Sequence, residues 1–146
     1  MFLIQIEVKN LKSHEIIKGK ELMGKELIKA VLNKDDKLLK KILDSKDITI
    51  INYQDKAGFT ALHFAIQENQ YDYVVQLIEA GADFEIADMY GNTAIIRAVS
   101  SFKGDGRIIK LLLSKGADIN KENNYGVSAI EWAKNVANYD IISLFK

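Results

Sequence analysis

The apolar positions of this chain follow a long-range repeat rather than a single helical or strand period. The segment DKAGFTALHFA, which starts at Asp55, returns 33 residues later as DMYGNTAIIRA from Asp88 and again as NNYGVSAIEWA from Asn123. Downstream of the first two copies, LIEAGAD from Leu77 matches LLSKGAD from Leu112. Self-similarity at a period of roughly 20–50 residues indicates units that stack, because no single unit can bury its apolar face alone.

Within each unit, the pattern predicts a turn, a short helix, a second turn and a longer helix. The Asp-x-x-Gly stretch is turn chemistry, because glycine adopts positive φ without steric cost. A hydroxyl then stands where an N-cap oxygen accepts from the free amides of the first helical turn, at Thr60, Thr93 and Ser128. Gly81 and Gly116 follow leucine-rich segments, where a left-handed residue ends a helix. The sequence therefore predicts an all-α chain of short helical hairpins.

These motifs resemble the ankyrin repeat, whose pattern runs D-x-x-G-x-T-P-L-H-x-A and continues to a Leu-Leu pair and G-A-D. The copies, from the closest match to the most degenerate, are residues 55–87, 88–122, 123–146 and 25–54. The resemblance implies an ankyrin-type solenoid of stacked helix-turn-helix repeats with protruding turns, about four repeats including caps. It places an ankyrin repeat domain over residues 25–146, preceded by an N-terminal extension or cap, residues 1–24.

Two features depart from the family pattern. Alanine replaces the family's proline at the first helical position, at Ala61, Ala94 and Ala129. This replacement removes the fixed φ of proline but keeps a good helix former. His63 keeps the family's structural histidine, whereas Ile96 and Glu131 stand at the equivalent positions. We therefore expect His63 to hydrogen-bond locally and to serve neither as a metal ligand nor as a catalyst.

The N-terminal extension shows a different pattern. Ile4, Ile6 and Val8 alternate with polar residues, which predicts a short strand, and a helix is expected from Ser13 to Met23. We expect this extension to cover the first repeat, since solenoids need capped ends.

Both flanks of the repeats contribute further helices. Residues 25–43 predict a lysine-rich helical hairpin, and residues 138–146 predict a capping helix whose Ile141 and Leu144 face the core. Trp132 is expected to cover the end of the core; the alternative is that it anchors a partner.

Composition narrows the functional classes. The 146 residues include 20 basic and 20 acidic side chains and no cysteine. The net charge of zero argues against nucleic acid as the main partner, since that binding depends on neutralising phosphates. The lack of cysteine excludes disulfides and thiolate sites. Residues 51–100 hold two basic against seven acidic side chains, a local net charge of −5, which suits a basic protein partner; the alternative is an ordinary solvated surface.

No pattern indicates catalysis, metal binding or cofactor binding. The segment from Gly19 to Lys25 has the G-x-x-x-x-G-K spacing of a phosphate loop, but Glu26 follows where the motif needs Ser or Thr for Mg²⁺. Residues 104–106 contain one acidic residue, Asp105, and lack the series of acidic ligands of a Ca²⁺ loop, so they are interpreted as a turn. No enzymatic activity, metal or cofactor is therefore expected. Since the apolar runs are short and no secretory signal is expected, we predict a cytoplasmic protein.

The resemblance implies a protein-binding module, because ankyrin-like repeats hold partners with their turn tips and the concave face of their first helices. Carried over by position, the expected contact residues are Lys56, Phe59, Gln67, Glu68, Met89, Tyr90, Asn92, Ser100, Ser101, Asn124 and Tyr125. Tyr90 and Tyr125 have the character of interface anchors; the alternative is that their rings pack on adjacent turns. Arg97, in the register of Phe64 and Trp132, is expected to stack between those rings rather than reach a partner's carboxylate.

Two functional hypotheses follow. The first is a non-catalytic binding module, monomeric when free, that binds another protein and neither nucleic acid nor membrane. Its narrower form is a bacterial immunity protein that neutralises a basic cognate toxin, suggested by the small size, the Lys/Ile/Asn-rich composition and the acidic middle. The second hypothesis is a structural subunit or self-associating scaffold that makes its contacts through residues 1–24.

Overall fold

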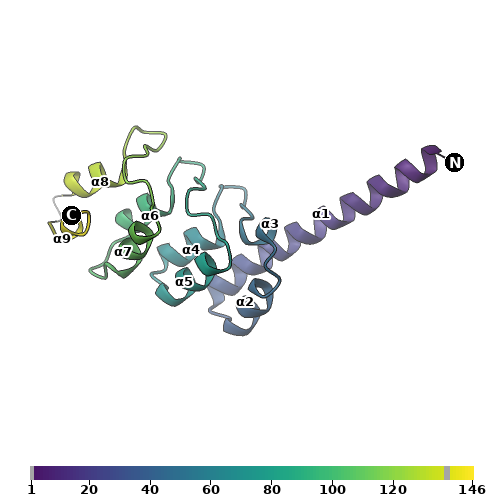
Figure 1. The fold of residues 1–146 in the computed structure, drawn as a ribbon, viewed down its shortest axis with the longest axis horizontal. Coiled ribbons are helices and arrows are strands. Elements are labelled where there is room, and N and C mark those ends of the chain that lie inside the picture. The colour runs from purple at the N-terminus through teal and green to yellow at the C-terminus, as the bar shows by residue number, and fades with distance from the viewer. Residues whose placement is uncertain (1, 137–138) are drawn as a thin grey trace.

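The computed structural model describes residues 2–136 and 139–146, with side chains for residues 12–136 and 140–146. These residues form helices and no strands (Figure 1). The helices are α1 (Phe2–Asn33), α2 (Asp36–Leu43), α3 (Ile48–Ile51), α4 (Ala61–Gln67), α5 (Tyr71–Glu79), α6 (Ala94–Ser100), α7 (Arg107–Ser114), α8 (Ala129–Asn135) and α9 (Tyr139–Leu144).

The hairpins stack in chain order, and their long loops protrude along one edge (Figure 1). The first helices form one row, in which α4 contacts α1 and α6, and α6 contacts α8. The second helices form another row, in which α5 contacts α7. This arrangement confirms the predicted all-α solenoid, and residues 55–87 and 88–122 lie next to each other as stacked repeats must.

The core is built from positions that recur in the sequence. Ala65, Ala98 and Ala133 on the first helices are buried, and their small side chains let neighbouring helices approach closely. Leu77 and Leu112 occupy equivalent places on the second helices and are fully buried. Because apolar burial contributes about 25 cal/mol per Å², the stability of each repeat depends on the neighbour that covers it.

The predicted hydroxyl caps form at two of the three positions. The Thr60 hydroxyl accepts from the His63 amide at 3.3 Å and belongs to a reciprocal capping box, as does Ser128 at the start of α8. Thr93 makes no such bond, and its buried hydroxyl has no partner among the described residues. Ile96 occupies the third helical position there and cannot return the second bond of a capping box. The prediction of a hydroxyl cap is therefore wrong for α6.

The N-terminal region forms one helix, α1, instead of the predicted strand followed by a helix. Ile4, Ile6 and Val8 lie within α1, and the described residues contain no strand that could pair with them. A short alternating segment without a partner strand cannot satisfy its backbone as a sheet. The helix is anchored at its C-terminal end, which forms the first helix of residues 25–54, where Leu27 and Val31 are buried in the core and α1 contacts α2, α3 and α4. From there it runs out of the stack towards the N-terminus (Figure 1). The expectation that the extension covers the first repeat is therefore wrong for most of its length, and the contact is limited to the stretch from Lys20 to Gly24.

The G-x-x-x-x-G-K segment lies inside α1 and therefore forms no phosphate loop. Gly24 has a packing role instead, because a Cβ built there would lie 2.3 Å from Cγ of Tyr53. Lys20 pairs with Asp47 at 3.0 Å, which holds α1 against the start of α3.

The C-terminal hairpin ends the stack. Ile141 on α9 is buried, which confirms its inward position, and Leu144 is part-buried beside Gly106. Trp132 is part-buried against the core, as expected of a residue that covers the last repeat. Asn138, at the start of the predicted capping helix, lies outside the described residues.

Candidate functional site

The protruding loops of three successive repeats share one internal geometry. Each begins with a side chain whose Oδ1 accepts from the backbone amides two and four residues ahead, at 2.8–3.1 Å; these residues are Asp55, Asp88 and Asn123. A glycine follows three residues after each of them and adopts positive φ, 76° at Gly58 and 78° at Gly91, where other residues would be strained. The Asp-x-x-Gly motif therefore closes each loop on itself.

Hydrogen bonds between loops join the tips into a ladder. The Met89 amide donates to the Ala57 carbonyl at 2.9 Å, and the Asn124 amide donates to the Tyr90 carbonyl at 3.0 Å. The side chain of Asn124 donates to the Met89 carbonyl at 2.9 Å. Because the tips are held before any partner arrives, their binding costs little additional conformational entropy.

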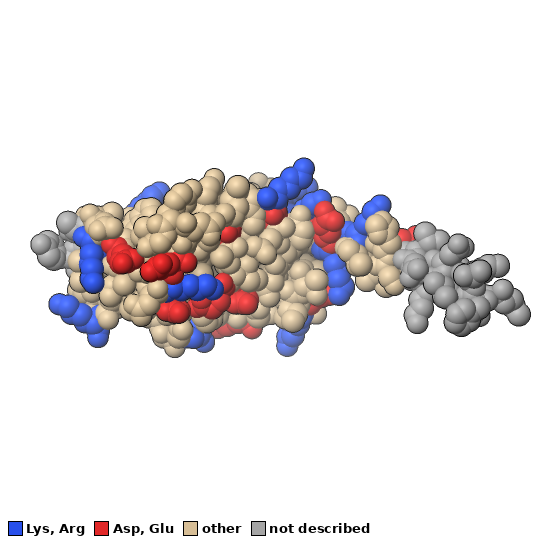
Figure 2. Space-filling view, turned by 90° about the horizontal axis from the view of Figure 1, so that it is seen from above, with Lys and Arg blue, Asp and Glu red and all other residues tan. Residues whose placement is uncertain are grey.

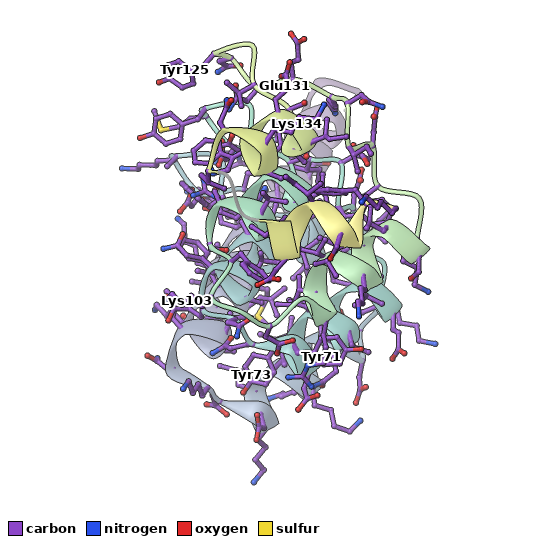
Figure 3. All side chains as sticks on the ribbon, turned by 90° about the vertical axis from the view of Figure 1, so that its left-hand side faces the viewer. Tyr71, Tyr73, Lys103, Tyr125, Glu131 and Lys134 are labelled. Carbon is purple, nitrogen blue, oxygen red and sulfur yellow. The ribbon has the colours of Figure 1, made fainter. Side chains whose placement is uncertain are left out.

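The side chains on these tips are large and project into solvent. Met89, Tyr90 and Tyr125 expose 57%, 42% and 73% of their surface. Figure 3 shows Tyr125 at the outer end of its loop, directed away from the helices. This exposure favours a free contact surface over the alternative in which the rings pack on adjacent turns. Tyrosine supplies a large contact area with few rotors to immobilise.

The other expected contact residues divide between the surface and the interior. Those that are exposed are Lys56, Gln67, Glu68, Ser100 and Asn124, and those that are part-buried are Phe59, Asn92 and Ser101. The Phe59 ring packs against the rings of His63 and Phe64, with centroids 5.8 and 5.4 Å away. The Asn92 side chain accepts from Asn123 Nδ2 at 2.9 Å. Phe59 and Asn92 therefore support the loops from within.

Arg97 links a loop to the helix that follows it. Its Nη2 pairs with Oδ2 of Asp88, whose side chain is fully buried, and its Cζ lies 4.8 Å from the ring centroid of Phe59. The expected stack between Phe64 and Trp132 is wrong. The guanidinium instead turns to the Asp88 carboxylate, because a buried charge requires an opposite charge beside it.

His63 makes the local hydrogen bonds expected of it. Its Nδ1 accepts from the Thr60 amide at 3.0 Å, so the ring is neutral and Nε2 carries the hydrogen, 3.3 Å from the Asn92 carbonyl. Burial lowers the pKa of His63, and the nearby Asp88 carboxylate opposes this only in part. The histidine therefore ties the second repeat to the loop of the third.

A cleft of a different kind lies at the edge away from the tips. It is lined by Lys34, Asp36, Asn69, Gln70, Tyr71, Asp72, Tyr73 and Arg107. Figure 3 shows Tyr71 and Tyr73 far from Tyr125. Tyr73 donates to Asp36, and burial raises the pKa of Tyr73 to about 12. The Arg107 guanidinium lies 4.6 Å from the Tyr71 ring centroid. Gln70 donates to the Val31 carbonyl at 3.2 Å, and its buried Oε1 has no partner among the described residues. The cleft residues form no recognisable catalytic set.

Acidic side chains gather over the central part of the face seen in Figure 2, with a basic side chain among them. Between repeats, the Glu85 carboxylate accepts from the Asp118 amide at 3.1 Å and lies 3.7 Å from Lys121 Nζ. The acidic middle of the sequence is therefore partly neutralised by contacts between repeats.

The described residues include no group of three or more His, Asp or Glu placed to hold a metal ion. None of the helices in these same segments combines the length and the apolar character needed to cross a membrane.

Sequence reasoning assigned Asp88 and Asn123 only to turns and missed their part in organising the tips. The signal was present, because a side-chain acceptor recurs at the first position of each loop. No recurring feature of the sequence predicts that Asp88 pairs with Arg97, because Phe64 and Trp132 stand at the positions equivalent to Arg97.

Comparison with known proteins agrees with this architecture. Residues 27–123 match the family described as ankyrin repeats (3 copies). Similar proteins include the B-cell lymphoma 3 protein homolog of Mus musculus, 34% identical over 88 residues, which cover 60% of this chain and 18% of that protein. The nuclear factor NF-kappa-B p105 subunit of Gallus gallus is 34% identical over 84 residues, 56% of this chain and 8% of that protein.

A viral protein shows the same likeness. An ankyrin repeat protein of Fowlpox virus (strain NVSL) is 36% identical over 100 residues, which cover 65% of this chain and 29% of the viral protein. The chain therefore spans less than a third of the length of each of these relatives.

Proposed function

The chain belongs to the ankyrin repeat family, and we propose that it acts as a non-catalytic module that holds a partner protein with its loop tips and the adjoining concave face. Ankyrin repeats generally mediate protein–protein interaction. The observation that carries the proposal is the row of exposed Met89, Tyr90 and Tyr125 on loops that hydrogen bonds already hold in place. Exposed aromatic anchors on a rigid support are typical of binding hot spots.

The proposal is tested by the double variant Tyr90→Ala with Tyr125→Ala. A partner captured from lysate by the immobilised protein and identified by mass spectrometry is titrated against both proteins. The variant should bind it at least about tenfold more weakly, because hot-spot truncations cost about 2 kcal/mol or more, while its helical circular dichroism stays unchanged.

A matched control removes apolar surface elsewhere. Ile17 is an exposed apolar residue on α1, outside both the tips and the concave face of the repeats, so Ile17→Ala should leave the affinity unchanged. Equal affinities for the tip variant and the wild type would remove the loop tips from the proposed surface.

The acidic surface favours a basic partner, and an immunity protein that neutralises a basic toxin is the narrower form of this proposal. The relatives reported above are vertebrate and viral proteins and lend no support to a bacterial source.

If the partner is basic, raising the salt concentration should slow association, since steering by surface charge is screened. For the narrower form, co-expression with the captured partner should rescue cells from its toxicity; a partner that is harmless alone would exclude it.

A further inference from the structure

The projecting half of α1 carries apolar surface that the repeat stack does not use. α1 is anchored through Leu27 and Val31, and its N-terminal half leaves the stack (Figure 1). On that half, Ile16 and Leu22 expose 60% and 58% of their surface. An isolated helical segment is only marginally stable in water, so a contact that covers these side chains would stabilise it.

Gly19 lies at the centre of this surface, and no contact among the described residues requires a glycine there. A glycine in a helix interior costs about 1 kcal/mol relative to alanine. At Gly24 the Tyr53 ring leaves no room for a Cβ, whereas a Cβ built at Gly19 would meet no described atom within 4 Å. A glycine in an exposed helix face permits the close approach of another backbone.

The residues around Gly19 match one another when the helix is paired with an antiparallel copy of itself. Lys12 and Glu26 lie seven residues before and after Gly19, nearly two helical turns, so the three share one face. Ile16 and Met23 lie together on one flank of that face. A two-fold axis at Gly19 brings Ile16 against Met23 of the second copy and Lys12 against Glu26 of the second copy, and each contact occurs twice.

We propose that the protein forms an antiparallel homodimer through this surface, the Gly19 face, which consists of Lys12, Ile16, Gly19, Met23 and Glu26. Charge selects the orientation, because a parallel pair in register would place each Lys12 beside the other Lys12 and each Glu26 beside the other Glu26. The apolar part of the face is continuous with the fold, since Met23 already packs against the core of the first repeat.

The existing contacts of the Gly19 face leave room for these pairs. Glu26 pairs with Lys29 on its own helix at 2.8 Å, an exposed contact of a kind that contributes about 0–1 kcal/mol. The Glu26 carboxylate can therefore accept a second ammonium group. Dimerisation would replace the expected monomer and would leave the loop tips, on the protruding edge of the stack, free for a partner protein.

The first test compares two adjacent isoleucines by sedimentation velocity over about a hundredfold range of concentration. Ile16 lies on the Gly19 face, whereas Ile17, which is 63% exposed, points to the opposite side of the helix. Ile16→Glu should raise the dimer dissociation constant at least about tenfold, and Ile17→Glu should leave it unchanged. A wild-type chain that stays monomeric throughout, or equal weakening by both variants, would overturn the proposal.

A charge-reversal experiment tests the register. Lys12→Glu should weaken the dimer, since it places two carboxylates together, and Lys12→Glu combined with Glu26→Lys should restore it. Circular dichroism verifies that each variant is folded. If the double variant is as weak as the single one, the antiparallel pairing at Gly19 is wrong. Tyr90→Ala with Tyr125→Ala should not change the dimer, so the failure of one proposal is distinguishable from the failure of the other.

Discussion

The two central repeats share a backbone pattern and the same hydrogen bonds within their loops, but different side chains connect each loop to the helix that follows it. In residues 55–87, the Thr60 and His63 side chains form a capping box, and His63 also reaches the Asn92 carbonyl of the next repeat. A neutral hydrogen-bond network therefore joins helix start, ring and neighbouring loop.

In residues 88–122, the corresponding cap is missing. Ile96 fills the position of the histidine with an apolar side chain, and Thr93 keeps a buried hydroxyl without a partner among the described residues. Asp88 still accepts from two loop amides, as Asp55 does, and its other carboxylate oxygen forms an ion pair with Arg97 on the following helix. The same repeat geometry therefore accommodates either a capping box or an ion pair at this place. The side-chain interactions that stabilise the start of the first helix differ from one repeat to the next.

The largest effect is expected at Asp88. Asp88→Ala removes the acceptor of two loop amides and leaves Arg97 part-buried without its counter-charge, which should cost about 3–5 kcal/mol in the free energy of unfolding. Asp55→Ala removes the same loop acceptor where no arginine is paired, and should cost about 1–3 kcal/mol. Urea denaturation measures both values. Equal losses would mean that the ion pair contributes nothing beyond the loop bonds.

A smaller effect should distinguish Thr60 from Thr93, the threonines that precede α4 and α6. Thr60→Val breaks a capping box and should cost about 0.5–2 kcal/mol. Thr93→Val removes a buried hydroxyl that has no partner in the described part of the chain, so it should be neutral or slightly stabilising. Thermal and urea unfolding of the two variants gives the comparison directly, and a greater loss at Thr93 would contradict it.

The smallest expected effect is the pH dependence that His63 gives to the free energy of unfolding. Its folded-state pKa lies below the ordinary value of 6.5 because the ring is buried. The unfolded chain therefore takes up this proton first as the pH falls, and stability is lost from about pH 6.5 downwards, through the folded-state pKa. Asp88 favours the protonated ring and Arg97 disfavours it, but burial is the larger cause.

The matched variant for this titration is His63→Gln. It should unfold more easily at neutral pH, yet it should lack the part of the pH dependence that begins near the histidine pKa. Urea midpoints collected at several pH values for both proteins make the comparison. A wild-type slope that persists unchanged in His63→Gln would assign the pH dependence to other groups.

Much of the fold was predictable because repeats encode it locally and more than once. The recurrence of turn, cap and leucine-rich segments located the helices of residues 55–122, and Gly81 and Gly116 have the positive φ expected at helix ends. The prominence of Tyr125 also followed from its place in the loop motif. The loop ladder was not predictable, because it depends on carbonyl and amide positions that only the stacked loops establish.

By itself, the sequence determined the period, the hairpins, the turns and the absence of cysteine chemistry, since each depends on residue type and local spacing. Only the tertiary structure decided that residues 2–33 form one helix, that Arg97 turns to Asp88 and Phe59, and that Thr93 has no partner among the described residues. These outcomes depend on which side chains meet across repeats, where burial decides between competing contacts of similar energy. The hydrophobic and polar pattern of the sequence does not predict these contacts.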